Sequence, residues 1–204
     1  MPVDSNQPSL LLSAFPPELA GLDQNPPPGW QVRCTGVGAV TAAVTTAGFL
    51  AELKPSRVLF VGTCGAYDDR LAIGDLLEAS EALSVSLDEL EGRAYRPTIE
   101  CVRWPATLAL TPPLGLPAHT VAVSTAITKD VEGVQRFAEC APAGHLELTG
   151  VFAACHGAGV PCGAVLGVAN RVGPDAHVEW KANNVRVSQS LIETLMAKGV
   201  FDGD

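Results

Sequence analysis

The most constraining feature of the sequence is a short, nearly unbroken apolar run, RVLFV, at residues 57–61. Such a run is typical of a strand that is buried on both faces, as in sheets that helices cover on each side. A second run of this kind extends from Cys162 to Val168. Strands of this type need helical layers to cover them. The sequence therefore predicts a layered α/β fold.

The segments around these two runs fit an alternation of strands and helices. Further strands are expected at residues 10–14, 30–34, 75–83, 98–104 and 119–124. Helices are expected at residues 39–53, 130–139, 148–157 and 178–198, and a short helix or turn begins at Glu18, behind Pro16-Pro17. A chain of 204 residues is long enough for one core of ordinary size, so we expect a single domain over residues 1–204.

The composition excludes several classes of protein. Hydrophobic residues make up 47% of the chain and charged residues 17%, which excludes a disordered chain. The formal net charge of −9 gives a surface that repels phosphate backbones and anionic membranes, so neither nucleic acid nor a membrane is an expected partner. The first apolar run, Leu10 to Phe15, follows no basic segment and is too short for a secretory signal or a membrane span.

The cysteines and histidines form no metal or redox motif. The six cysteines contain no CxxC pair, and the four histidines contain no HExxH motif. We therefore expect no metal site. Cysteines without such a pattern act as small hydrophobic residues in a reducing compartment, which predicts a cytoplasmic protein.

A glycine-containing turn, TGVGAVT, occupies residues 35–41 between an expected strand and an expected helix. A dinucleotide-binding turn would have its third glycine where this chain has Thr41, and no acidic residue follows on a suitable strand. Two interpretations stay open. The segment is either a tight strand-to-helix turn or a loop whose backbone N–H groups face a small molecule.

Three polar residues lie at expected ends of strands or starts of helices. Each has a structural alternative: Glu18 as a partner of the helix dipole, Glu147 as a helix cap, and Asn170 as a turn residue after the strand 162–168. Together they supply two carboxylates, one amide and no metal. Such a set suits cleavage of a glycosidic bond, which needs a base for water, a group that holds sugar hydroxyls and a hydrogen-bonding group for the leaving group.

The order of motifs resembles the purine nucleoside phosphorylase and nucleosidase superfamily from Leu10 to nearly Trp180. Four segments contribute to this resemblance: SAFPPEL (13–19), TGVGAVTAA (35–43), VGTCGAYDDRLAIGDLL (61–77) and HLELTGVFAACHGAGVP (145–161). The resemblance implies a three-layer α/β/α sandwich with a central mixed, partly barrel-like sheet. It also implies a small-molecule purine nucleoside as partner and no cofactor.

The resemblance assigns roles residue by residue. Glu18 matches the glutamate that activates water in the hydrolytic members, and Asn170 matches the residue that bonds the N7/O6 edge of the purine. Glu147 matches the glutamate that holds the ribose hydroxyls, with Leu146 in the place of the family's methionine. Pocket roles fall on Thr63, Cys64 and Gly65, and base-stacking roles on Ile127 and Thr128.

Two features favour hydrolysis over phosphorolysis. Phe60 stands where the hexameric phosphorylases carry an arginine, and Arg33 is the one arginine near the Gly36 turn. The segment ANRVGPDAHVEW, residues 169–180, resembles the tail of futalosine hydrolases, which release hypoxanthine in menaquinone biosynthesis. We therefore expect a futalosine-type nucleosidase. The alternatives are a methylthioadenosine/adenosylhomocysteine nucleosidase, a purine nucleoside phosphorylase and a nucleoside-binding module without catalysis.

The resemblance also implies assembly, since a neighbouring subunit closes the 5′ pocket in the related hydrolases. The proline-rich segment from Trp104 to Pro117 has no charged side chain and is the expected interface. We therefore expect a homodimer or a higher homo-oligomer.

Overall fold

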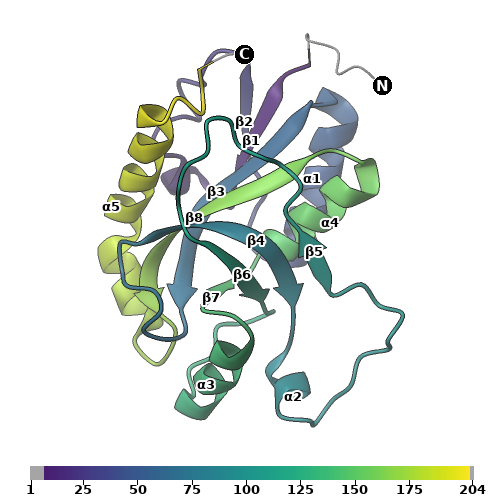
Figure 1. Ribbon diagram of the computed structural model, residues 1–204, viewed down its shortest axis with the longest axis vertical. Helices are drawn as coiled ribbons and strands as arrows, with labels where there is room; N and C mark the ends of the chain where they lie inside the picture. The colour runs from purple at the N-terminus through teal and green to yellow at the C-terminus, as the bar shows by residue number, and fades with distance from the viewer. Residues whose placement is uncertain (1–6, 203–204) are drawn as a thin grey trace.

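A computed structural model describes residues 7–202 of the chain. Within these residues a mixed sheet of eight strands forms the centre, with α5 on one side and α1 and α4 on the other (Figure 1). The strands are β1 (Ser9–Ser13), β2 (Trp30–Cys34), β3 (Arg57–Ala66), β4 (Leu76–Ser84), β5 (Arg103–Pro105), β6 (Ala118–Val123), β7 (Ala143–His145) and β8 (Cys162–Arg171). The helices are the 3-10 helix η1 (Pro16–Leu19), α1 (Ala39–Leu53), α2 (Leu87–Leu90), α3 (Val131–Cys140), α4 (Leu148–Ala158) and α5 (Ala176–Ala197).

The sheet closes on itself at β3 and β8. These two strands pair in parallel over most of their length, and β3 also pairs with β1 and, at its end, with β7. β8 pairs in addition with β4, β4 with β6, and β6 with β7, which returns the path to β3. The five strands β3, β8, β4, β6 and β7 thus form a ring, and β2 and β5 lie at the two edges of the sheet. The predicted α/β fold with a mixed, partly barrel-like sheet is confirmed.

Most expected elements lie within a few residues of their predicted positions. The strand predicted at residues 98–104 is wrong, because residues 98–101 are exposed and only Arg103–Pro105 pairs, with the edge of β4. β3 and β8 continue past residues 61 and 168 because their ends pair with each other. The sequence does not indicate β7 or α2, since three or four residues are too few to show a periodicity.

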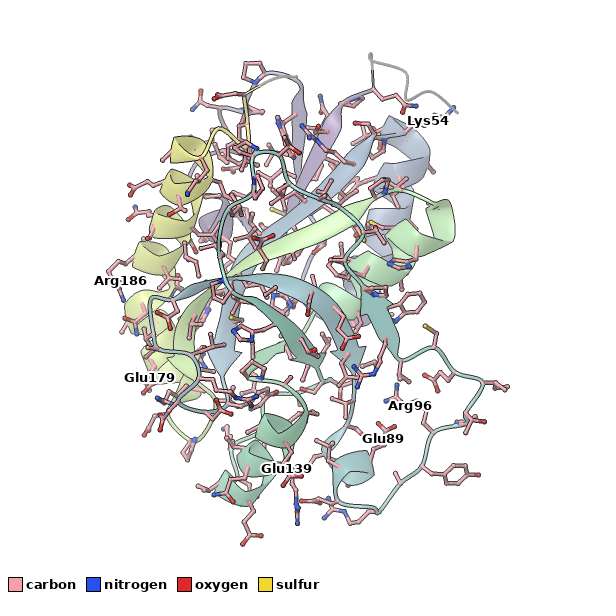
Figure 2. All side chains as sticks on the ribbon, in the orientation of Figure 1. Lys54, Glu89, Arg96, Glu139, Glu179 and Arg186 are labelled. Atoms are coloured by element: carbon pink, nitrogen blue, oxygen red, sulfur yellow. The ribbon has the colours of Figure 1, made fainter. Side chains whose placement is uncertain are left out.

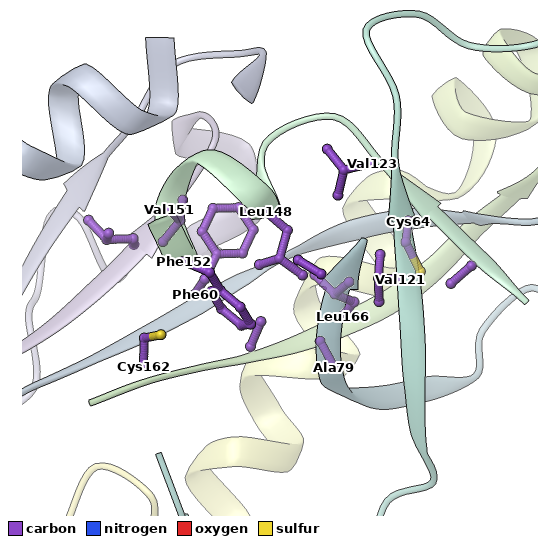
Figure 3. Close-up of a cluster of buried hydrophobic side chains, with 14 of the residues drawn as sticks. Phe60, Cys64, Ala79, Val121, Val123, Leu148, Val151, Phe152, Cys162 and Leu166 are labelled. Carbon is purple, nitrogen blue, oxygen red and sulfur yellow. The ribbon is translucent and has the colours of Figure 1, made fainter. Parts of the chain in front are cut away.

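Two hydrophobic clusters cover the two faces of the sheet. One lies between the sheet and helices α1 and α4, where Figure 3 shows Phe60 next to Phe152. The other lies beneath α5, where Leu59 packs in one cluster with Leu191. Neighbouring residues of β3 therefore belong to opposite faces, and both faces are buried, as its apolar run predicts.

Most charged side chains lie on the outside of the molecule, as Lys54, Glu139 and Arg186 show in Figure 2. In the segment after α2, the Arg96 guanidinium donates to the Glu89 carboxylate at 2.6 and 2.7 Å and lowers the pKa of Glu89 to about 2 (Figure 2). Within the described part of the chain, every helix is too short or too polar to cross a membrane.

The proline-rich segment 104–117 does not offer its larger apolar side chains to a partner. Leu114 is buried, and Leu108, Leu110 and Leu116 pack against the cluster beneath α5. The prolines of the segment are exposed. The absence of charge in this segment is therefore explained by its packing on the chain's own core. The homo-oligomer stays a prediction, and this segment does not support it.

Helices α1 and α4 approach each other at Gly150. A Cβ atom at this position would lie 2.0 Å from the carbonyl oxygen of Ala39 and 3.0 Å from the amide nitrogen of Ala43. Both atoms belong to backbone and cannot rotate away. The absence of a side chain at Gly150 thus brings the first turn of α4 against the first turn of α1.

Gly150→Ala should lower the free energy of unfolding by about 2 kcal/mol or more, because the methyl group forces the two helices apart. Gly157→Ala is the matched control in α4, since a Cβ there meets open space. It should leave stability unchanged or raise it by up to about 1 kcal/mol, as alanine favours the helix over glycine. Urea unfolding of both variants measures the difference, and equal effects would contradict the close approach.

Candidate functional site

A cavity of about 400 Å³ opens at the carboxyl ends of β1, β3 and β8. Its size lies in the range of small-molecule sites, and its position is the one that α/β sheets use for ligands. The lining residues are Ala14, Phe15, Glu18, Val37, Thr63, Cys64, Gly65, Tyr67, Ser124, Ala126, Ile127, Gly144, His145, Leu146, Glu147, Asn170, Val172, Ala176, His177 and Trp180. Most of them are apolar or aromatic, so the few polar groups stand out.

Glu18 is held in the cavity wall by the rigid turn after β1. Two prolines begin η1, and the carboxyl group of Glu18 is buried. Its Oε1 accepts hydrogen bonds from the Thr63 backbone N–H at 2.8 Å and from the Thr63 hydroxyl at 2.7 Å. Its Oε2 accepts one longer bond, from the Ala14 N–H at 3.3 Å.

Burial raises the pKa of Glu18 to about 7. The hydrogen bonds from Thr63 favour the ionised form and oppose this shift, while the nearby Glu147 carboxylate adds to it. A carboxyl group with a pKa near neutrality can exchange a proton at the pH of a cell. Glu18 therefore has the properties of a general base.

Glu147 stands at the N-terminus of α4 and is buried. Its Oε1 accepts a hydrogen bond from the Gly38 N–H at 2.8 Å, and its Oε2 lies 3.1 Å from Nδ1 of His145. Gly38 has a φ of 93°, which an L side chain rarely adopts. The glycine segment is thus a tight strand-to-helix turn, and its Gly38 N–H faces a carboxylate of the cavity. That its backbone N–H groups face a small molecule stays a prediction.

Asn170 lies on β8 rather than after it, because the strand continues to Arg171. Its side chain is buried, and Nδ2 donates to the carbonyl oxygen of Arg171 at 2.8 Å. A register shift in the pairing of β3 with β8 places Asn170 opposite Gly65. A Cβ atom at Gly65 would lie 3.0 Å from Nδ2 and 2.7 Å from the Val172 side chain, so only glycine leaves room for this amide.

Of the other residues predicted for the site, Thr63, Cys64, Gly65, Leu146 and Ile127 line the same cavity. Thr128 does not. It lines a neighbouring hollow between α2 and α3, where its methyl group lies next to Gly133. Ile127 lines both the cavity and this hollow, whereas Thr128 lines the hollow alone.

Sequence reasoning missed His145, His177 and the aromatic wall of the cavity. His145 is buried, and burial lowers its pKa. Its Nδ1 lies 3.1 Å from the backbone nitrogen of Glu147 as well as from that residue's carboxylate. The sequence feature that could have indicated His145 is its position two residues before Glu147, a predicted site residue. Phe15 and Trp180 carried no signal, because a single aromatic residue in a sequence usually belongs to the core.

The charge of the cavity comes from its two carboxylates. Among the residues that line it in the described part of the chain, none is an arginine or a lysine. Phe60 is fully buried in the core, and the Arg33 guanidinium bonds to the Val32 carbonyl and to the Gln31 side chain. A phosphate dianion would find no arginine or lysine among these residues, whereas a neutral water molecule needs none.

The model of the phosphorylase superfamily matches residues 32–133, half of the chain, and the chain belongs to this superfamily. The fold is also shared, at low sequence identity, with two solved structures from Helicobacter pylori. A futalosine hydrolase structure superposes with a TM-score of 0.81 at 19% identity, over 94% of this chain and 98% of that one. A 5′-methylthioadenosine/S-adenosylhomocysteine nucleosidase superposes with a TM-score of 0.81 at 18% identity, over 94% and 97%.

Curated relatives match over a shorter stretch. The 5′-methylthioadenosine/S-adenosylhomocysteine nucleosidase of Shewanella sediminis is 33% identical over 57 residues, which are 28% of this chain and 25% of the relative. The enzyme of the same name from a Marinomonas species is 32% identical over 54 residues, 26% of this chain and 23% of the relative. The match thus spans about a quarter of the length of these relatives.

Glu18→Gln should change how stability depends on pH. The pKa of Glu18 is raised in the folded protein, so the contribution of Glu18 to stability is fully present below about pH 4.5 and is lost as pH rises through about 7. A glutamine has no proton to lose. The difference in unfolding free energy, variant minus wild type, should therefore increase by on the order of 2 kcal/mol between pH 5 and pH 8.

Urea unfolding at the two pH values measures this difference. Glu193→Gln, at an exposed position of α5, is the control and should show no such change. If the curves of wild type and Glu18→Gln stay parallel across this range, Glu18 does not titrate in the folded protein as its burial requires.

Proposed function

We propose that the protein is a nucleosidase that hydrolyses the N-glycosidic bond of a purine nucleoside. The observation that carries the proposal is the buried Glu18 carboxyl, with a pKa raised to about 7, in the same cavity as Glu147 and Asn170. Family membership and the shared fold support it, because the solved neighbours include nucleosidases.

In the proposed mechanism, Glu18 acts on water. Its Oε1 is occupied by the two donors of Thr63, so Oε2 is the oxygen that takes a proton from a water molecule at the anomeric carbon. The water oxygen bonds to that carbon as the bond to the purine nitrogen breaks. The electron pair of the broken bond leaves with the base, and the sugar passes through an oxocarbenium-like state.

Glu147 and Asn170 hold the two ends of the substrate. Glu147 keeps lone pairs on both oxygens beyond the bond from Gly38, and these accept the 2′ and 3′ hydroxyls of the ribose. Asn170 bonds to the N7 and 6-position edge of the purine and stabilises the charge that develops there as the base leaves.

Hydrolysis, rather than phosphorolysis, predicts a product without phosphate. With wild-type protein, release of purine base should be independent of added phosphate and should yield the free sugar, because the described residues that line the cavity include no arginine or lysine. Chromatography of the products, with and without phosphate, measures both. Ribose 1-phosphate among the products would mean that the chain is a phosphorylase.

Glu18→Gln is the matched control for this assay. It keeps the size of the side chain and removes its basicity, so base release should fall by about 10²–10⁴-fold while the nucleoside still binds. Binding by the wild type without base release from any purine nucleoside would instead indicate a nucleoside-binding module.

Two purine nucleosides are candidate substrates. They differ in whether the Asn170 side chain would donate a hydrogen bond to the purine through its N–H or accept one through Oδ1. A 6-oxopurine, as in futalosine, has acceptors at O6 and N7, and the second N–H of the Asn170 amide can donate to them. A 6-aminopurine, as in methylthioadenosine, has a donor at the 6-position. This candidate is supported by the bond from Nδ2 to the Arg171 carbonyl, which leaves Oδ1 as an acceptor, and by the names of the curated relatives.

We take the 6-oxopurine as the first candidate and predict at least a tenfold preference for it in kcat/KM. A buried polar group left unpaired with the other base costs about 1–3 kcal/mol, and 1.4 kcal/mol is a factor of about ten. Asn170→Asp should narrow or invert the preference, since an ionised carboxylate only accepts. Inosine-type and adenosine-type substrates with the same 5′ group decide it, and an adenine preference in the wild type selects the second candidate.

Two further expectations belong to this proposal. All six cysteines are free thiols, which supports a reducing compartment such as the cytoplasm. Assembly into a homo-oligomer rests on the family resemblance.

A further inference from the structure

We propose that Trp180 is a positioning residue for the general base, Glu18. Through the Thr63 hydroxyl, Trp180 fixes which carboxylate oxygen of Glu18 faces the substrate. The inference rests on the proposed function, in which Glu18 takes the proton from water. It concerns a residue of α5 that lies far from Glu18 and Thr63 in the sequence.

The contacts form a short chain of hydrogen bonds. The indole Nε1–H of Trp180 donates to Oγ1 of Thr63 at 3.1 Å, and the Thr63 hydroxyl donates to Oε1 of Glu18 at 2.7 Å. The Thr63 backbone N–H donates to the same carboxylate oxygen at 2.8 Å. Three elements, α5, β3 and η1, thus meet at one hydroxyl group.

The direction of this chain follows from the chemistry of its members. An indole nitrogen can only donate, so the Thr63 oxygen must accept from Trp180. A hydroxyl has one hydrogen, and with the indole in place that hydrogen points to Glu18. The result is an Oε1 with two donors and an Oε2 with only the longer bond from Ala14. The Oε2 atom is therefore the carboxylate oxygen that remains available to take a proton.

The indole is held at this place by its neighbours in the cavity wall. The ring centroid of Phe15, which precedes η1, lies 5.8 Å from that of Trp180. The ring of His177 is stacked on Trp180, with 6.0 Å between the centroids and 9° between the planes. Trp180 also lines the cavity, so it is a wall and a donor at once. A phenylalanine at this position would keep the wall and lose the donor.

Other titratable groups near Glu18 belong to five parts of the fold. Glu147, before α4, raises the pKa of Glu18, and His145 of β7 contacts Glu147. Burial raises the pKa of the Cys64 thiol on β3 to about 12, and that of Cys34 on β2 is also raised, so both stay neutral near pH 7. His177 of α5 stacks on Trp180 and must be controlled for.

The first experiment follows the indole N–H signal of Trp180 by NMR as pH is varied, without substrate. The signal should shift with a midpoint near pH 7, because its acceptor is bonded to the titrating Glu18. Trp30, which is buried elsewhere, is the internal reference. The shift should persist in His177→Gln and disappear in Glu18→Gln and Thr63→Val. A shift that persists in Glu18→Gln overturns the inference.

The second experiment compares kcat/KM as a function of pH for the wild type and Trp180→Phe. Without the indole, the Thr63 hydroxyl is free to turn from Glu18, the ionised base loses a donor, and the acidic limb should move up by about half a pH unit or more. The variant should therefore lose about threefold more activity below this limb than above it. Trp104→Phe, outside the cavity, is the matched control and should keep the wild-type profile.

A decrease in kcat/KM of Trp180→Phe that is equal at every pH would mean that Trp180 only lines the cavity, and this result would overturn the inference. Failure of the wild type to release any base is a different result, since it contradicts the proposed function. The NMR titration needs no substrate and still decides the inference in that case.

Discussion

Strand β3 is the element on which the geometry of the cavity depends. It pairs with β1, β7 and β8, and each of these strands carries or precedes one polar group of the site: Glu18 after β1, Glu147 after β7 and Asn170 on β8. β3 itself supplies Thr63, which bonds to Glu18. Because backbone pairing fixes register to the residue, the three groups are placed by a rigid sheet rather than by mobile loops.

Burial of Glu18 works against stability and in favour of proton transfer. An ionised carboxylate in an apolar wall costs free energy, and the donors of Thr63 and Ala14 offset only part of that cost, since burial has the largest effect on the pKa of Glu18. The compact core on both sides of β3 can tolerate such a group. The same burial raises the pKa of Glu18 to about 7, which suits a general base.

The sequence predicts the layers, most elements and the three polar groups of the site, because these depend on local patterns. Apolar runs such as residues 57–61 indicate buried strands, and a strand's carboxyl end indicates where Asn170 and its neighbours gather. The ends of β3 and β8 were predicted too short, since their pairing with each other is a long-range contact. Residues 98–104 have strand-like composition, yet most of them find no partner strand and stay exposed.

The parts of the site that the sequence does not predict are those that depend on side chains brought together by the fold. The partners of Thr63 include Trp180, and only the packing of α5 over η1 shows that an indole reaches a hydroxyl on β3. The orientation of the Asn170 amide depends on a carbonyl oxygen that becomes an acceptor because β8 ends there. A motif identifies which residue types meet in a cavity. The direction in which each hydrogen bond runs, and hence which atom is left for a ligand, follows from the complete set of donors and acceptors around it.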